Sequence, residues 1–135
     1  MIAVDTSVVV PAFAAWHEAH DTAMRLLADD PVIPAHVALE TYSVLTRLPV
    51  PHRVPGPIVV EYLDRVFPPR RRLTASAELQ AGLPARCAAL GIDGGAVYDV
   101  LIGAIALEHA ATLATRDLRA APFYRAVGVE VRLQL

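Results

Sequence analysis

Lysine is absent from this chain of 135 residues, and all twelve of its basic residues are arginine. Fourteen acidic residues bring the formal net charge to −2. A domain that binds nucleic acid through its overall charge has a basic excess and a high isoelectric point, and this chain lacks the basic excess. A polyanionic partner would therefore need a local group of arginines or bound metal ions.

Cysteine is almost absent too. Cys87 is the one cysteine, which excludes a disulfide framework and a cysteine-rich zinc site and fits a reducing compartment. No run of about 18 apolar residues is free of charge, so we expect no transmembrane helix. Residues 1–5 contain no basic residue of the kind that begins a signal peptide. We therefore expect a soluble, cytoplasmic protein that does not contact a membrane.

The composition that is present suits one globular domain. Hydrophobic residues make up 55% of the chain and charged residues 19%, which excludes an intrinsically disordered protein. The length is that of one ordinary domain, and no linker or internal repeat divides it. We therefore expect a single domain over residues 1–135.

Short apolar segments alternate with helical patterns along the chain. Strands are predicted at residues 2–4, 32–33, 111–114 and 129–133, with a weaker one at 70–74. Helices are predicted after Thr6 and Ser7 and then at residues 17–28, 35–48, 57–67, 76–90, 96–109 and 118–126. This alternation predicts an α/β fold with a mainly parallel central sheet flanked by helices on both faces.

Four carboxylates occupy positions that ordinary surface residues do not. Asp5 and Asp117 each follow a predicted strand, and ligand sites of α/β proteins form at the carboxyl ends of strands. Glu40 lies within the apolar stripe of its helix. Asp99 lies in a helix that is apolar all round, and no arginine stands three or four residues away. Its partner must therefore come from elsewhere in the fold or be a metal ion.

Each of these acids also has a structural interpretation. Asp5 and Asp117 could cap the helices that follow them, and Glu40 could reach water from the edge of its stripe. The set is more informative than its members, because four carboxylates brought together would repel one another unless cations joined them. Hard cations such as Mg²⁺ take oxygen ligands, and two such ions can stabilise both oxygens of a phosphoryl transfer.

Four motifs, in this order and spacing, resemble those of the PIN-domain ribonucleases and in particular the toxins of VapBC-type toxin–antitoxin pairs. They are residues 2–7 (IAVDTS), 38–45 (ALETYSVL), 98–104 (YDVLIGA) and 113–117 (LATRD). The resemblance extends over essentially the whole chain and implies a single PIN-like α/β domain. It implies metal-dependent endoribonuclease activity on RNA phosphodiester bonds.

The resemblance places the acidic quartet of the family on Asp5, Glu40, Asp99 and Asp117. It implies that the three aspartates hold Mg²⁺ or Mn²⁺, and that Glu40 helps to hold a second ion or orients the attacking water. Its small polar positions fall on Thr115 and on Thr6 or Ser7, which would support the metal ligands.

Substrate and partners are implied less directly. Arg116 is the preferred contact for the RNA, and Arg47, Arg53 and Arg119 are weaker ones. The family implies a structured RNA such as a transfer or ribosomal RNA, a small VapB-like antitoxin that blocks the acidic site, and a homodimer.

Two other functions stay open. The domain could be a non-catalytic, PIN-like metal-binding interaction module, or it could use Asp5 as a phosphate acceptor. The absence of lysine argues against the acceptor, because a lysine usually helps to hold the phosphate.

Other residues receive structural interpretations. His17 and His20 stand three residues apart, whereas the zincin motif needs four. Phe13 and Trp16 are interpreted as core or dimer-interface residues, and Asp93 as the N-cap of the Asp99 helix.

Overall fold

We analysed a computed structural model that describes residues 1–134. Its strands are β1 (Ile2–Val4), β2 (Ile33–Pro34), β3 (Arg72–Leu73), β4 (Thr112–Thr115) and β5 (Val131–Leu133). Its helices are α1 (Thr6–Phe13), α2 (His20–Leu27), α3 (Ala35–Thr46), α4 (Gly56–Val66), α5 (Ala77–Leu90), α6 (Ala96–Glu108) and α7 (Ala121–Ala126), and a 3₁₀ turn spans Pro69–Arg71. The alternation of strands and helices that the sequence predicts is thus confirmed.

The sheet is parallel throughout the described residues. Strands β1, β4 and β5 pair in the order β1-β4-β5, and β2 pairs with β3. A parallel bridge between Ala3 and Val32 joins the two parts. Val4 is aligned with Ala114, so the residues that follow β1 emerge beside the end of β4. The register therefore fixes where Asp5 and Thr115 meet.

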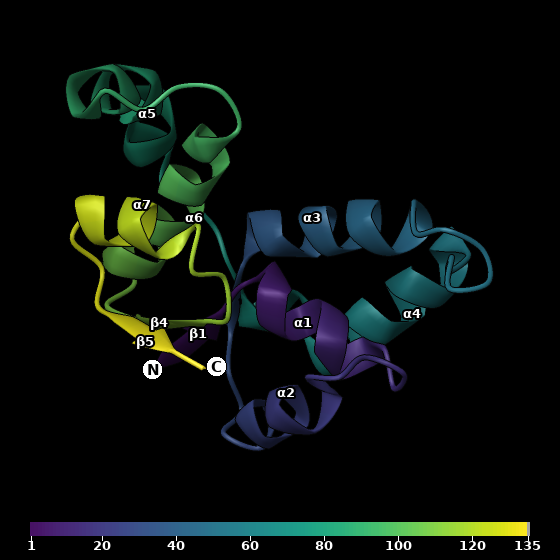
Figure 1. Ribbon diagram of the computed structural model, residues 1–135. Coiled ribbons are helices and arrows are strands. Elements are labelled where there is room, and N and C mark those ends of the chain that lie inside the picture. Colours follow the sequence, from purple (N-terminus) through teal and green to yellow (C-terminus); the bar gives the residue numbers. More distant parts are fainter. Residues whose placement is uncertain (135) are drawn as a thin grey trace.

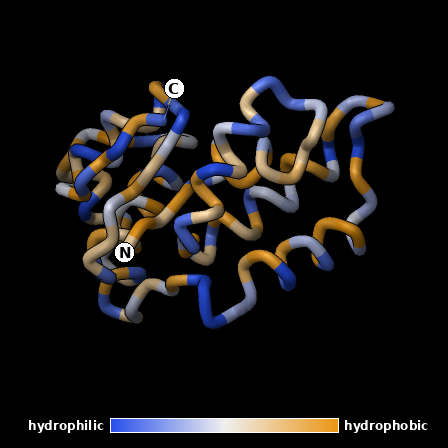
Figure 2. Tube along the Cα trace, turned by 90° about the horizontal axis from the view of Figure 1, so that it is seen from below, coloured by the Kyte–Doolittle hydropathy of each residue, from blue (hydrophilic) through white to orange (hydrophobic). Residues whose placement is uncertain are grey.

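Helices α6 and α7 pack against each other beside β4 and β5 (Figure 1). Gly103 of α6 allows this close approach, since a Cβ atom there would lie 2.9 Å from Cγ2 of Val127 and 3.3 Å from Cα of Tyr124. The inner face of α6 is apolar and buried, including Val100, Ile102 and Ala106. Along the helices, hydrophobic and hydrophilic residues change every few positions, as expected for elements with one buried face (Figure 2).

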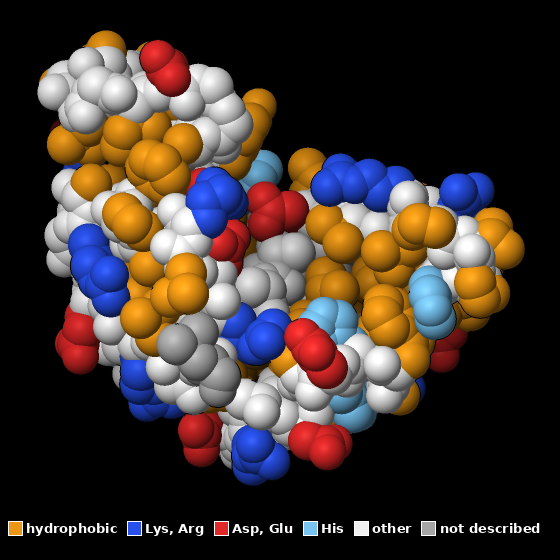
Figure 3. All heavy atoms as spheres, viewed as in Figure 1, with side chains coloured by type: hydrophobic (Ala, Val, Ile, Leu, Met, Phe, Trp, Pro, Cys, Tyr) orange, Lys and Arg blue, Asp and Glu red, His pale blue; other side chains and the backbone are white. Residues whose placement is uncertain are grey.

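The side of α6–α7 and the side of α3–α4 form two arms with a hollow between them (Figures 1 and 3). Acidic and basic side chains gather in this hollow, while much of the surface on either side is hydrophobic (Figure 3). No helix within residues 1–134 is both long and apolar enough to cross a membrane.

Several local predictions were wrong. Residues 17–19 form turns, and α2 begins at His20, because His17 Nδ1 accepts from the amide of Ala19. Gly95, with no capping side chain, precedes α6, so Asp93 is not its N-cap. Of the two interpretations of Trp16, the core one is wrong, because the residue is 53% exposed, and the dimer-interface one stays a prediction.

Candidate active site

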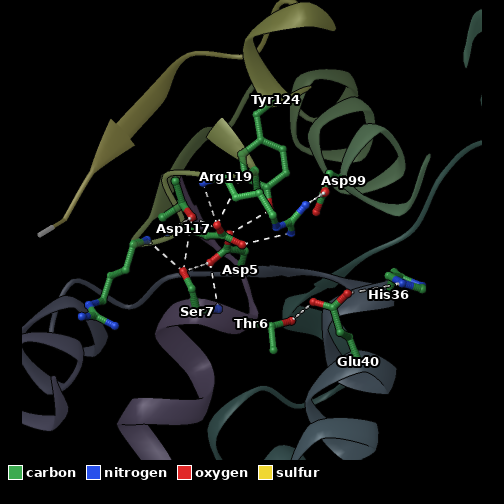
Figure 4. Close-up of polar contacts among 12 residues, drawn as sticks. Asp5, Thr6, Ser7, His36, Glu40, Asp99, Asp117, Arg119 and Tyr124 are labelled. Carbon is green, nitrogen blue, oxygen red and sulfur yellow. Dashed lines mark hydrogen bonds and ion pairs between the residues drawn. The ribbon is translucent and has the colours of Figure 1, made fainter. Parts of the chain in front are cut away.

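Asp5 lies at the centre of a hydrogen-bond network, although only 3% of its surface is exposed. It caps α1, since Oδ1 accepts from the amide of Ser7 at 3.1 Å and from the Ser7 hydroxyl at 2.5 Å. Oδ2 accepts from the hydroxyls of Thr115 at 2.5 Å and Tyr124 at 2.8 Å. Four donors from three elements thus hold one carboxylate in place (Figure 4).

Ser7 and Thr115 connect the end of β1 to the end of β4. Their hydroxyl oxygens lie 3.2 Å apart. Ser7 Oγ also accepts from the amide of Arg116 at 2.8 Å, and Thr115 Oγ1 accepts from the amide of Asp117 at 3.0 Å. The loop that carries Asp117 is therefore tied to the residues that hold Asp5. Supporting bonds of this kind orient carboxylates at metal sites.

Arg119 joins two further acids. Its Nη1 lies 3.0 Å from Oδ2 of the buried Asp99, and its Nη2 lies 3.1 Å from Oδ2 of Asp117. Asp117 in turn accepts from the amides of Arg119 and Ala120, and so shapes the turn that precedes α7. Of the two partners predicted for Asp99, a residue from elsewhere in the fold or a metal ion, the structure shows the first, an arginine twenty positions along the chain.

Glu40 approaches the same region from α3. Thr6 at the start of α1 donates a hydrogen bond to its Oε1, and His36 Nε2 lies 3.9 Å from Oε2 (Figure 4). The Glu40 side chain is 35% exposed. Glu40 forms a second group beside the Asp5 network, with its carboxylate open to solvent. We call Asp5, Glu40, Asp99 and Asp117 the acidic cluster.

Charge and burial oppose each other within the acidic cluster. Burial raises the pKa of Asp5 above its ordinary value, although its four hydrogen bonds act in the opposite direction. Burial also raises the pKa of Asp99, whereas Arg119 lowers it and the charges of Glu40 and Asp117 add to the rise. Without additional positive charge, burial therefore disfavours the ionised forms of Asp5 and Asp99.

The donor set suits a hard cation. The acidic cluster offers carboxylate oxygens, which Mg²⁺ and Mn²⁺ prefer, and the side chains that support it offer hydroxyls. Within residues 1–134 no three potential ligand side chains are close enough to form a preformed metal site. The guanidinium of Arg119 supplies the positive charge between Asp99 and Asp117 instead. By the chemistry of their donor atoms these residues fit a hard cation, and Arg119 occupies the space between two of them.

A groove of about 350 Å³ runs beside these residues. Its lining includes Thr6, Ser7, His17, Glu40, Arg116 and Asp117. The Nε atom of Arg116 is buried without a hydrogen-bond partner in the described part of the chain. The expectation that Arg116 lies near the acids is met, although Arg119 is the arginine that contacts them.

The family model of the PIN domain, a description of the family's sequences, matches residues 2–128 of the chain. The chain belongs to the PIN domain family. This PIN domain is 47% identical over 133 residues to "Ribonuclease VapC40" of Mycobacterium tuberculosis, with 98% of both chains covered. It is 40% identical over 131 residues to "Ribonuclease VapC27" of the same species, with 96% of this chain and 94% of the relative covered.

Two solved structures share the fold of this PIN domain. One is that of FitAcB from Neisseria gonorrhoeae, with a TM-score of 0.67 and 22% identity over 97% of this chain and 96% of that one. The other is that of VapBC2 from Rickettsia felis bound to a DNA fragment from its promoter. Its TM-score is 0.62, with 20% identity over 98% of each chain.

The structure of this PIN domain brings all four predicted acids into one region, with Thr6 and Thr115 as direct partners of two of them. Tyr124 was not among the predicted site residues, and Arg119 was predicted only as a weaker RNA contact. Neither residue has a signal in the sequence, because each reaches its acid through tertiary packing. His17 and His20 have protein partners of their own, in the amide of Ala19 and the carbonyl of Pro11.

Proposed function

We propose that this PIN domain is a metal-dependent endoribonuclease and the toxin of a toxin–antitoxin pair. The observation that carries the proposal is the convergence of four acids from separate parts of the chain on one open hollow. Family membership, and the ribonuclease names of relatives that match almost the full chain, support the same conclusion.

Asp5, Asp99 and Asp117 would hold Mg²⁺ or Mn²⁺, and Glu40 would hold a second ion or position the attacking water. A bound metal ion at this place supplies Lewis-acid stabilisation of the phosphate and a more acidic water. The chain's own residues do the positioning. Ser7, Thr115 and Tyr124 fix the Asp5 carboxylate, and Thr6 holds Glu40 toward the hollow.

Arg119 has two places in this scheme. It neutralises Asp99 and Asp117 in the metal-free protein, and its own side chain is 66% exposed, so its release requires another cation on the acids rather than a rearrangement of the core. With a metal ion on the aspartates, the Arg119 guanidinium would be available for a phosphate oxygen, for which arginine is well suited. Arg116, which lines the groove together with Asp117, would supply a second contact for the RNA backbone.

The partner is a small VapB-like antitoxin. The relatives carry VapC names, and one structural neighbour is a VapBC assembly. Such an antitoxin would cover the acidic cluster and prevent RNA from reaching it. A homodimer is a further expectation from the family.

The decisive experiment is cleavage of total RNA by the purified protein with Mg²⁺, with Mn²⁺ and with EDTA. Discrete cleavage that requires a metal and disappears in Asp99→Asn supports the proposal. Asp93→Asn is the matched control, because Asp93 is an exposed acid near the start of the same helix and outside the acidic cluster. Metal binding without cleavage under any condition would instead support the non-catalytic binding module.

A second experiment tests the partner. Any short reading frame that adjoins the gene is co-expressed with this protein, and the cleavage assay is repeated on the purified mixture. Suppression of cleavage supports the toxin–antitoxin proposal, whereas full activity in a stable complex contradicts it.

A further inference from the structure

One face of α3 leads outward from the acidic cluster. Its side chains follow a helical spacing of three and four residues, so they lie in a row along the helix. Together with Tyr98 of α6 they line a groove of about 480 Å³, and the lining residues are His36, Leu39, Glu40, Ser43, Arg47 and Tyr98. We call this the α3 groove. It shares Glu40 with the acidic cluster.

An aromatic platform forms one wall of the α3 groove. The rings of His36 and Tyr98 are stacked, with centroids 5.3 Å apart and planes within 3° of each other. Tyr98 is 53% exposed, and Leu39 nearby is 66% exposed. Exposed apolar surface beside polar groups is a common mark of a binding site. A flat, exposed ring of this kind suits another flat ring.

Arg47 adds positive charge to the far part of the row. Its guanidinium is exposed, and Nη1 donates to the Ser43 hydroxyl at 2.9 Å rather than to a carboxylate. The hydrogen bond orients the side chain and leaves its charge available. The α3 groove therefore combines a stacking surface, an apolar side chain and a cation, which are the elements that recognise single-stranded nucleic acid.

Glu40 is also the point where two grooves meet. It lines the α3 groove and the groove that contains Arg116 and Asp117. A small substrate would occupy one of these pockets beside the acids. A polymer must continue on both sides of the bond that is cleaved, and the two grooves provide that continuation. Arg47 lines one of these grooves and Arg116 lines the other, so each groove has a cation for a backbone phosphate.

We infer that the α3 groove binds an unpaired nucleotide of the RNA next to the scissile phosphate. The base stacks on Tyr98, and Arg47 contacts a backbone phosphate. This inference rests on the proposed ribonuclease function and specifies the form of its substrate. Because every base has an aromatic face, Tyr98 selects an unpaired nucleotide rather than a particular base. Within a structured RNA, the cleaved bond then lies in a loop, bulge or end.

Binding of short fluorescein-labelled oligoadenylate, measured by fluorescence anisotropy in EDTA, tests the stacking. Tyr98→Leu keeps an apolar side chain but removes the ring, and we expect the Kd to rise roughly 5- to 100-fold. Tyr98→Phe keeps the ring and should bind like the wild type. In the cleavage reaction, Tyr98→Leu should raise KM and change kcat little. An unchanged Kd for Tyr98→Leu would overturn the inference.

The salt dependence of the same binding tests Arg47. Arg47→Gln should weaken binding and lower the slope of log Kd against log salt by about 0.7, the value for one phosphate of a single strand. Arg25→Gln is the matched control, because Arg25 is an exposed arginine on α2, away from both grooves. Equal slopes for Arg47→Gln and the wild type would contradict the phosphate contact.

Photo-crosslinking separates a failure of this inference from a failure of the proposed function. An oligonucleotide that contains 4-thiouridine is irradiated with the protein, and the linked peptides are identified by mass spectrometry. A crosslink to Tyr98 or His36 supports the α3 groove even if the protein cleaves no RNA. Metal-dependent cleavage with no crosslink there, and with a change in oligomeric mass in Tyr98→Leu, would show that a second copy covers this face.

Discussion

Nη1 of Arg119 lies 3.0 Å from Oδ2 of Asp99, and the same guanidinium reaches Asp117. Asp99 is almost fully buried, whereas the arginine side chain is mostly exposed. The buried acid is thus neutralised by a cation whose own side chain lies at the surface. This arrangement makes Arg119 a competitor for any metal ion that binds between the two aspartates.

We therefore expect Arg119→Gln to bind Mn²⁺ more tightly than the wild type. A cation that occupies a site lowers the apparent affinity of a second cation for that site. Coupling between two ligands typically changes affinity by roughly 5- to 150-fold, and we expect an effect in this range. Isothermal titration calorimetry on the metal-free protein measures the effect. Arg25→Gln, which leaves the acidic cluster untouched, should show the wild-type affinity. Weaker Mn²⁺ binding by Arg119→Gln would show that the arginine holds the acids in place for the metal.

Removing the Tyr124 hydroxyl should destabilise the protein. Tyr124→Phe keeps the buried ring but takes away the 2.8 Å hydrogen bond to Oδ2 of Asp5. A hydrogen bond to a charged group contributes about 1.5–3 kcal/mol, and we expect a loss of that order in the free energy of unfolding at neutral pH. Urea denaturation measures it.

Tyr62→Phe provides the control. Tyr62 is also buried, yet its hydroxyl has no hydrogen-bond partner within the described residues. Removing an unsatisfied buried hydroxyl should leave stability unchanged or raise it. Equal losses in Tyr62→Phe and Tyr124→Phe would mean that the bond to Asp5 contributes nothing specific.

The raised pKa of Asp5 predicts a definite dependence of stability on pH. A carboxyl whose pKa is higher in the folded than in the unfolded protein binds more protons when folded. The stability that this proton binding contributes to the folded protein is complete at pH values below the unfolded-state pKa of about 3.9. It is lost as the pH rises through the pKa of the folded state. In EDTA, Asp5→Asn should therefore gain stability relative to the wild type over this window.

Urea denaturation of both proteins across the acidic range tests this prediction. Asparagine is as good an N-cap as aspartate, so α1 keeps its start. The substitution also removes an acceptor for the hydroxyls of Thr115 and Tyr124, but that loss does not vary with pH over this range, so the pH dependence of the difference reports the charge. If the free energy of unfolding of the wild type instead rises relative to that of Asp5→Asn as the pH rises, the prediction is contradicted. The hydrogen bonds to Asp5 would then outweigh its burial.

Gly103 should not tolerate a side chain. Its Cβ would lie 2.9 Å from Val127 Cγ2 and 3.3 Å from Cα of Tyr124, and the backbone atom of Tyr124 cannot give way easily. We expect Gly103→Ala to cost about 1–3 kcal/mol, as overpacking of a core does. Gly82→Ala in α5 meets open space and should stabilise its helix by about 0.5–1 kcal/mol. Thermal unfolding of both variants and the wild type measures these changes. A Gly103→Ala variant as stable as the wild type would show that α6 and α7 can move apart.

The sequence determined the acids and their order. A short apolar strand before Asp5, an apolar helix around Asp99 and a strand before Asp117 are local patterns, and α/β topology carries the ends of parallel strands to one edge. Thr115 was predicted from the family resemblance, and the register that aligns Val4 with Ala114 brings it beside Asp5. The predicted N-terminus of α2 and the predicted cap of α6 were wrong, since the bends and turns at residues 15–19 and 94–95 depend on local backbone hydrogen bonds that periodicity does not report.

Only the tertiary structure decided which side chains serve these acids. Tyr124 reaches Asp5 across 119 positions, because Gly103 lets α7 approach α6. Arg119 reaches Asp99 from a turn, where no periodic spacing relates the two. The stacking of His36 on Tyr98 joins two helices in the same way. Backbone periodicity fixes which face of an element a residue occupies, whereas contacts between elements depend on packing of the whole chain.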